Sequence, residues 1–320
     1  MKALFIVNPN AGLRVFQNIA YDVARHLLQS GDLDVCQFLY TKKGGDAFEA
    51  TAGLKPGEWD FVLAAGGDGT VNEVVNGLMT SDCGIPLLVL PAGTTNDFAT
   101  ALGIGRSSLA LEKLVKSFCV KDVDVGVCNG RYFLNSASGG VISNIAHNIP
   151  PEQKAQFGIL AYYSAGLKEF GDGNFTTSRL RITTKEETFE EDVFLLVIAN
   201  SFQAGGFQNL APAAKLDDGL MDVFVVRNVG PFDVIPLVSM IQTGQHVKDE
   251  KHFKCIKTDG MHVELLGDGL FSLDCDGESL GKMPMDFKVS EKKLKLLVPA
   301  NSPKTKKLFS SKPAGRKPVK

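Results

Sequence analysis

The stretch DFVLAAGGDGTVNEVVN, residues Asp60 to Asn76, decides the fold of this chain. Phe61 to Ala65 is a short apolar run of the kind that forms a buried strand. The glycine-rich turn at residues 66–69 follows, and glycine lets the backbone turn tightly and approach a ligand closely. Thr70 and Glu73 have the spacing of a capping box, so we expect a helix to begin at Thr70.

This turn predicts an anion site that also needs a cation. A strand, a glycine turn and a helix N-terminus together present backbone N–H groups and a positive dipole to an anion. Asp68 places a carboxylate in the middle of that site, and a carboxylate beside a phosphate calls for a cation between them, usually Mg²⁺. The plainer alternative is a turn in which Asp68 only caps the helix. The turn matches neither the Walker A loop nor the G-x-G-x-x-G fingerprint.

The same unit of strand, small-residue turn and helix recurs through the first third of the chain. Strands are expected at residues 3–7, 35–40, 61–65 and 85–90, each followed by a helix. This alternation predicts an α/β N-terminal domain with a parallel sheet and helices on both faces. Right-handed crossovers then bring the four connecting loops to the carboxyl edge of the sheet. Asp68 and Asp97 should therefore share one rim with Thr41, Thr70, Thr94 and Thr95.

From residue 122 the pattern changes to short alternating strands with glycine-rich turns, which predicts a mainly antiparallel β-sandwich as a second domain. Residues 122–127 and 131–135 flank Asn129-Gly130, which predicts a hairpin with a type I′ turn. Residues 136–141 are expected to form a loop, and residues 150–170 and 232–242 helices. The predicted domains are residues 1–121, completed by residues 290–302, and residues 122–289. Residues 303–320 are rich in lysine and hold no acidic residue, which predicts a disordered basic tail.

Composition excludes several classes of protein. A net charge of −2 argues against a general nucleic-acid binder. No apolar run approaches the roughly 18 residues needed to cross a bilayer, and the N-terminal run that stops at Val7 is too short for a secretory signal. The six cysteines form no C-x-x-C pair and the five histidines no ligand motif, which favours reduced thiols in a cytoplasmic protein.

Two later carboxylate clusters have both a chemical and a structural interpretation. Asp217-Asp218-Gly219 could wrap a hard cation, although spacing alone favours an ordinary turn that leads into the next strand. Asp276-Gly277 should turn the chain and leave Glu278 on an exposed bend. A carboxylate there could take a proton from a substrate hydroxyl, but Asp-Gly turns are common.

Together these motifs resemble the diacylglycerol kinase catalytic-domain family of lipid kinases. The resemblance rests on Gly66 to Thr70 with Asn72-Glu73, Asn8-Pro9 with Gly12, Pro91 to Thr94 with Asn96 to Ala99, and the clusters at 211–220 and 276–278. It covers about residues 1–300 in the expected order. Tyr162-Tyr163, Gly166 and residues 281–284 most resemble the soluble Gram-positive bacterial type.

The resemblance implies roles for individual residues. ATP would be bound by Asn8, Pro9, Asn10, Ala11, Gly12, Thr41, Gly67, Asp68, Gly69, Thr70, Val71, Asn72, Glu73 and Thr94, with Asp97 on the same rim. Asp68 would also hold the catalytic Mg²⁺. The Lys215 and Leu220 carbonyls with the Asp218 side chain would bind a second, structural Mg²⁺, and Glu278 would be the general base.

The implied reaction is transfer of the ATP γ-phosphoryl group to diacylglycerol at the bilayer surface, giving phosphatidic acid. The enzyme would be cytoplasmic and peripherally membrane-associated, without a transmembrane segment or nucleic-acid partner, and family members are often homodimers. The basic tail could bind anionic lipid or only aid solubility. The alternatives are a kinase of a sphingoid base, phosphatidylglycerol or polyprenol, an NAD kinase, or a non-catalytic nucleotide- or lipid-binding protein.

Overall fold

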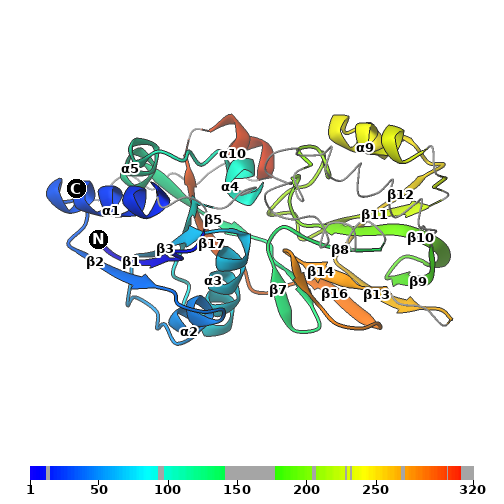
Figure 1. Ribbon diagram of the computed structural model, residues 1–320, viewed down its shortest axis with the longest axis horizontal. Helices are drawn as coiled ribbons and strands as arrows, with labels where there is room; N and C mark the ends of the chain where they lie inside the picture. The colour runs from blue at the N-terminus through cyan, green and yellow to red at the C-terminus, as the bar shows by residue number, and fades with distance from the viewer. Residues whose placement is uncertain are drawn as a thin grey trace.

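Two β-sheets, one six-stranded and one eleven-stranded, organise the molecule in the computed structural model (Figure 1). The structure describes residues 1–11, 15–92, 97–140, 177–203, 207–227, 229–230, 233–267, 271–300 and 302–310. Several sequence predictions therefore lie outside the described residues. They are Gly12, Thr94, Thr95, the helix at 150–170 with Tyr162, Tyr163 and Gly166, and the tail beyond residue 310.

The six-stranded sheet has the order β2-β1-β3-β4-β17-β5. Its strands are β1 (Lys2–Val7), β2 (Val35–Tyr40), β3 (Phe61–Gly66), β4 (Leu87–Pro91), β5 (Phe118–Val123) and β17 (Leu294–Pro299). The first four are parallel, as the sequence predicts. The central strands β3 and β4 are buried along their whole length because helices cover both faces of the sheet.

Those helices are α1 (Val15–Gln29), α2 (Asp46–Ala52), α3 (Asp68–Ser81), α4 (Asp97–Leu102) and α5 (Ser108–Lys116). Figure 1 shows α1 and α5 above the sheet and α2 and α3 below it. In α1, Ala20, Val23, Ala24 and Leu27 are all buried, and their spacing forms one apolar stripe against the sheet. The predicted α/β fold with helices on both faces is thus confirmed.

The end of the chain completes the first sheet. β17 is parallel to β4 and antiparallel to β5, which extends to Val123, two residues beyond the predicted boundary at 121. The sequence predicts one hairpin strand at residues 122–127. The structure instead divides this segment between β5 and β6 because Asp124 and Val125 cross from one sheet to the other, with Asp124 N–H bonded to Leu216 O at 2.7 Å.

Every strand pair in the second sheet is antiparallel, which confirms the predicted class of the second domain. Its strands are β6 (Gly126–Cys128), β7 (Arg131–Phe133), β8 (Ser136–Gly140), β9 (Ser178–Thr184), β10 (Thr188–Ala199), β11 (Met221–Arg227), β12 (Phe253–Thr258), β13 (Gly260–Leu265), β14 (Leu273–Cys275), β15 (Glu278–Ser279) and β16 (Met285–Val289).

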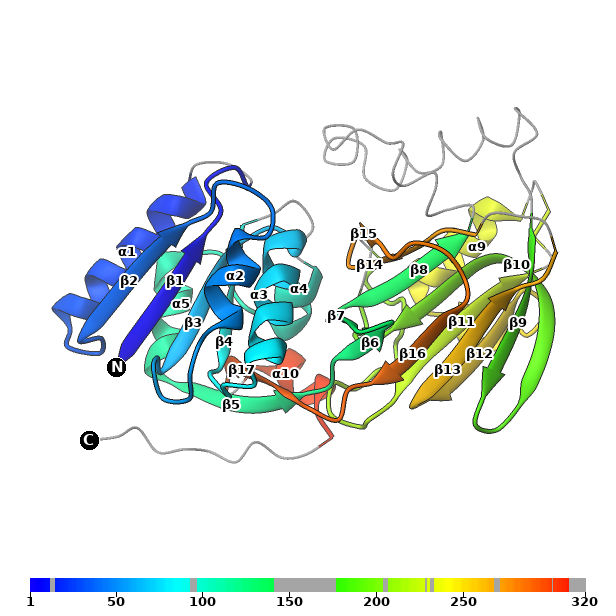
Figure 2. The same cartoon turned by 90° about the horizontal axis from the view of Figure 1, so that it is seen from below.

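This sheet curves around one apolar core (Figure 2). Phe133, Ile198, Val263 and Phe287 come from four different strands and meet in that core. The second half of β10 is buried on both faces. Its other face packs against α9 (Val234–Thr243), which is followed by a short 3₁₀ turn, η1 (His246–Lys248).

Residues 136–140 form the strand β8 rather than the predicted loop. β8 lies between β10 and β14, where small residues allow a close approach of neighbouring chains. A Cβ on Gly139 would lie 2.5 Å from Ser272 O, and one on Gly140 would lie 2.4 Å from Phe194 O. The small residues therefore reflect crowding between strands and not an irregular loop.

The predicted disordered tail is wrong for its first residues, because Pro303–Leu308 forms the helix α10. Ser302 precedes a proline at the first helical turn, a favourable helix start. Leu308 and Phe309 are buried, and Leu308 O accepts a hydrogen bond from Leu216 N–H at 2.9 Å. Apolar residues among the lysines thus fix this segment to both halves of the molecule.

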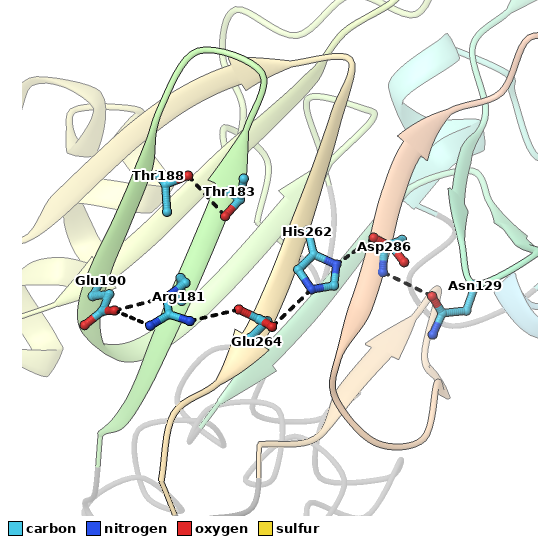
Figure 3. A network of polar contacts seen from close by, with 8 residues as sticks. All are labelled: Asn129, Arg181, Thr183, Thr188, Glu190, His262, Glu264 and Asp286. Atoms are coloured by element: carbon cyan, nitrogen blue, oxygen red, sulfur yellow. Dashed lines mark hydrogen bonds and ion pairs between the residues drawn. The ribbon is translucent and has the colours of Figure 1, made fainter.

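A ladder of polar contacts crosses the solvent-exposed face of the second sheet (Figure 3). Arg181 on β9 donates to Glu190 and Glu264, and His262 on β13 lies 2.7 Å from Asp286 Oδ1. Asp286 N–H then donates to Asn129 Oδ1 at 3.1 Å. The ladder ends at Asn129, in the turn between β6 and β7.

Candidate active site

The loop between β3 and α3 forms the expected helix N-terminus, but the helix begins two residues earlier than the capping box predicts. Asp68 is its first residue and Gly67 its extended N-cap. At Gly66 a side chain is impossible, since a Cβ would lie 2.4 Å from Thr70 Cβ. The turn is therefore tight enough to aim the first N–H groups of α3 and the positive end of its dipole outward from the sheet edge.

Other predicted nucleotide-binding residues meet at this edge. Asn8, directly after β1, donates from Nδ2 to Thr70 Oγ1 at 2.9 Å, and Asn10 N–H donates to Asn8 Oδ1 at 2.9 Å. Thr41, directly after β2, donates its N–H to Val7 O at 3.0 Å. Because the strands are parallel, residues far apart in sequence form one rim.

The Glu73 side chain does not close the predicted capping box. Its Oε1 accepts from Gly45 N–H at 2.9 Å and its Oε2 from Ala47 N–H at 3.2 Å. Glu73 therefore caps α2 and fixes the loop that follows Thr41. In that loop, N–H groups of Lys42 and Lys43 lower the pKa of Asp46.

Two other predicted contacts have buried side chains. Val71 packs in the core of the first domain, and Asn72 is 2% exposed, with its amide turned toward the second domain. Any contact from these residues to a nucleotide would have to come from the backbone. Asp97 is the first residue of α4, and only its backbone is described.

Glu278, far along the chain, lies against the first turn of α3. A Cβ built on Gly69 would be 3.8 Å from Glu278 Oε1, so the carboxylate and the helix N-terminus are near neighbours. Figure 2 shows β14 and β15 on the side of the second domain that faces α3. The structure thus brings the candidate base to the candidate phosphate site.

The residue that shapes this turn is Asp276, which has a φ of 47°. Its carboxylate accepts hydrogen bonds from Leu134 N–H at 2.7 Å, Asn135 N–H at 2.9 Å, Ser136 N–H at 3.1 Å and Asn72 Nδ2 at 2.9 Å. Burial raises the pKa of Asp276, and the four N–H donors oppose that rise because each favours the charged acceptor.

Sequence reasoning missed the contact of α3 with the hairpin of β6 and β7. Asn76 Nδ2 donates to Tyr132 O at 2.9 Å, and Tyr132 N–H donates to Asn76 Oδ1 at 3.0 Å. Asn72 and Asn76 are four residues apart and so lie on one face of the helix. That spacing was visible in the sequence, but nothing there named their partner.

Sequence reasoning also missed Arg131, which forms an ion pair with Glu278. One signal could have found it: Arg131 follows Asn129-Gly130 as Glu278 follows Asp276-Gly277. Both dipeptides are typical of type I′ turns, so both charged residues begin the strand after a hairpin turn.

The three predicted ligands of a structural metal lie in one loop before β11. Asp218 Oδ1 accepts from Leu220 N–H at 3.1 Å, and Lys257 Nζ lies 3.6 Å from Asp218 Oδ2. Gly219 N–H donates to the fully buried Asp124 at 2.7 Å, which shapes the loop. Within the described residues, no three His, Cys, Asp or Glu side chains could together hold a metal ion. One carboxylate with the Lys215 and Leu220 carbonyls and waters still suits Mg²⁺, which keeps several waters.

None of the helices in the described part of the chain is long and apolar enough to cross a bilayer.

Comparisons with known proteins agree with this architecture. Residues 2–128 match the model of the diacylglycerol kinase catalytic domain, and residues 136–298 match the YegS C-terminal NAD kinase beta sandwich-like domain. The chain is 33% identical over 287 residues to a diacylglycerol kinase of Bacillus subtilis, covering 89% of this chain and 92% of that protein. It is 31% identical over 287 residues to a diacylglycerol kinase of Staphylococcus saprophyticus, with coverage of 89% and 92%.

Solved structures give the same result. A Bacillus anthracis protein superimposes with a TM-score of 0.74 at 30% identity, covering 93% of this chain and 95% of that one. A diacylglycerol kinase structure from the same organism gives a TM-score of 0.69 at 26% identity, with coverage of 93% and 96%. With both halves matched by family models and relatives aligned over most of their length, this chain belongs to the diacylglycerol kinase family.

Proposed function

We propose that this protein transfers the γ-phosphoryl group of ATP to the primary hydroxyl of diacylglycerol, giving phosphatidic acid. The observation that carries the proposal is the position of Glu278 Oε1 beside Gly69, in the first turn of α3. A phosphate-binding helix N-terminus and a candidate base from the other domain are the two parts that phosphoryl transfer to an alcohol requires.

The α3 N-terminus and the loops after β1 and β2 would bind the ATP phosphates and ribose side by side. N–H groups at the start of α3 would donate to phosphate oxygens, where the helix dipole also favours negative charge. Gly12, Thr94 and Asp97 belong to this proposed set on sequence grounds. The Asp68 carboxylate is the oxygen donor that would hold Mg²⁺, which supplies neutralisation of phosphate charge when bound.

Glu278 would act as the general base. Its Oε1 would accept the hydroxyl proton of the lipid as the hydroxyl oxygen bonds to the γ-phosphorus. The bond from the γ-phosphorus to its bridging oxygen would break, and ADP would leave. Proton transfer of this kind contributes typically about 10²–10⁴-fold to a rate. Asp276 would fix the turn that carries the base.

We also propose that Lys215, Asp218 and Leu220 hold a structural Mg²⁺. The enzyme would work on the cytoplasmic face of a membrane as a peripheral protein. The boundary between the nucleotide-binding and lipid-binding domains would lie close to residues 124 and 290, where the chain crosses between the sheets. Support comes from the family to which the chain belongs and from the names of its relatives.

The test is an acceptor panel with γ-labelled ATP and Mg²⁺. Purified protein is given diacylglycerol, sphingosine, phosphatidylglycerol, a polyprenol or NAD, and the labelled product is identified. Labelled phosphatidic acid from diacylglycerol is the expected result. Label on another acceptor alone, or on none, would overturn the proposal.

A further inference from the structure

Two tight hairpins of the second domain bring together the residues that follow their turns, Arg131 and Glu278. The turn Asn129-Gly130 has φ values of 46° and 87°, and Asp276-Gly277 has 47° and 87°. Cys128 pairs with Arg131 across the first turn, and Cys275 pairs with Glu278 across the second. Arg131 and Glu278 therefore occupy equivalent positions in two copies of one local structure.

The two hairpins lie side by side. Cys128 and Cys275, the residues that precede the turns, are both buried in the same apolar core of the second domain. Arg131 Nη2 donates to Glu278 Oε2, which closes the contact on the opposite side of the turns. Shared burial at one end and an ion pair at the other define the relative position of the hairpins.

The two oxygens of Glu278 face different partners. Oε2 accepts the hydrogen bond from Arg131, while Oε1 is the atom near Gly69 at the start of α3. The ion pair therefore holds one oxygen and directs the other toward the phosphate-binding end of the helix.

Arg131 is itself held in place by its neighbours. The backbone N–H and C=O of Tyr132 are both bonded to Asn76 on α3. Asn129 is bonded to Asp286 through both its side chain and its backbone N–H. The arginine thus projects from a hairpin fixed to the first domain on one side and to β16 on the other.

We propose that Arg131 is a positioning residue that orients Glu278 for proton abstraction from the substrate hydroxyl. This inference rests on the proposed function, because it gives Arg131 a role through the candidate base. The side chains of Arg131 and Glu278 are 34% and 41% exposed. An ion pair this exposed adds little to folding stability, since water screens it. Its value lies in geometry, because a planar guanidinium fixes the direction of a carboxylate better than an ammonium does.

The experiment compares Arg131→Gln, Arg131→Lys and Arg131→Ala with the matched control Arg181→Gln. Arg181 also pairs with glutamates on an exposed face of the second domain, at the opposite end of the polar ladder from Asn129 (Figure 3). Because misplacement of a catalytic group by about 1 Å can cost about 10²-fold in rate, we expect Arg131→Gln to lower kcat by about 10- to 100-fold. The KM for ATP should change by less than about threefold, since the ATP site is intact.

Chemical rescue separates orientation from a structural role. Millimolar guanidinium ion should raise kcat of Arg131→Ala and leave Glu278→Gln unchanged, because it can act only through the carboxylate. Arg131→Lys should fall between wild type and Arg131→Gln, and Arg181→Gln should match wild type. Should Arg131→Gln fold poorly, the Lys variant and the rescue still decide the matter.

Wild-type kcat in Arg131→Gln would overturn the inference, as would a loss that neither lysine nor guanidinium ion reduces. An Arg181→Gln loss equal to that of Arg131→Gln would do the same. These results differ from failure of the proposed function, in which the wild-type protein itself transfers no phosphate to diacylglycerol.

Discussion

Asn72 of α3 donates from Nδ2 to Asp276 Oδ2 at 2.9 Å and so joins the two domains at the centre of the candidate site. The same Nδ2 lies 3.2 Å from Tyr132 O, so one amide contacts both hairpins. The helix whose N-terminus is proposed to bind phosphate is thereby tied to the turn that carries Glu278. The distance between the candidate phosphate site and the candidate base is set by side chains on both sides of the domain boundary.

Asn72→Ala should weaken this link. Asp276 would keep three backbone donors but lose its side-chain donor, and the loss of one bond to a buried charged group costs about 1–3 kcal/mol. We expect that loss in the free energy of unfolding together with a lower kcat. Urea unfolding and steady-state kinetics measure the two effects. Asn76→Ala is the comparison variant, because it removes the contacts of Asn76 with Tyr132 and with the Asn72 side chain but none with Asp276. If Asn76→Ala loses as much kcat as Asn72→Ala, the contact with Asp276 is not the important one.

Glu278→Gln should reduce transfer by about 10²–10⁴-fold, because the amide cannot take the hydroxyl proton. Asp68→Ala should abolish transfer as well, but by weakening Mg²⁺ binding. Varying the Mg²⁺ concentration distinguishes them: excess Mg²⁺ should partly restore Asp68→Ala and not Glu278→Gln. Circular dichroism checks that both variants fold, and normal turnover by either folded variant would remove that residue from the mechanism.

The pH dependence of stability should include a contribution from His262. Hydrogen bonding to Asp286 raises the pKa of His262 above the usual histidine value of 6.5, and the charge of Glu264 adds to the effect. A raised folded-state pKa stabilises the fold below pH 6.5, and this contribution disappears as the pH rises through the folded value. The groups are largely exposed, so the effect should stay below about 1 kcal/mol. His262→Gln should therefore lose stability at pH 5.5 and not at pH 9; equal losses at both values would contradict this assignment.

Truncation of the C-terminus should lower stability if it removes α10 and leave stability nearly unchanged if it begins after α10. Ending the chain before Pro303 removes the buried Leu308 and Phe309, each worth about 1.5–3 kcal/mol when buried. It also removes the contact of Thr305 Oγ1 with Leu102 O at 3.2 Å. Ending it after Ser310 removes none of these. Thermal unfolding should show a large decrease in melting temperature for the first version and little for the second. Similar melting temperatures for the two versions would mean that α10 does not stabilise the fold.

Membrane association of the basic tail is tested with the second of these versions. Residues 311–320 contain Lys312, Arg316, Lys317 and Lys320, and each such charge near an anionic surface contributes about 1 kcal/mol. The version ending at Ser310 should sediment less with anionic liposomes than the full chain, and not differ with neutral ones. Unchanged sedimentation would leave the tail without a role in binding.

The amino-acid sequence determined the parallel sheet, its carboxyl-edge rim and the antiparallel second domain. These depend on local signals: apolar runs of strand length, glycine turns and Asn-Gly or Asp-Gly dipeptides, whose backbone preferences act over a few residues. The predicted start of α3 and the predicted capping of α3 by Glu73 were wrong. The Glu73 side chain had another partner, the N-terminus of α2, that no local pattern could reveal. The predictions for residues 303–308 of the tail and for β8 were wrong because burial against distant residues outweighed a composition typical of loops.

Only the tertiary structure decided which side chains meet. The GGDGT motif pointed to a phosphate site and Asp276-Gly277-Glu278 offered a carboxylate, but Gly69 and Glu278 lie 209 positions apart in the sequence. Their proximity, the four donors to Asp276 and the pairing of Arg131 with Glu278 are products of packing between two domains. Such contacts depend on the summed geometry of two sheets and a helix, and no short window of sequence contains that information.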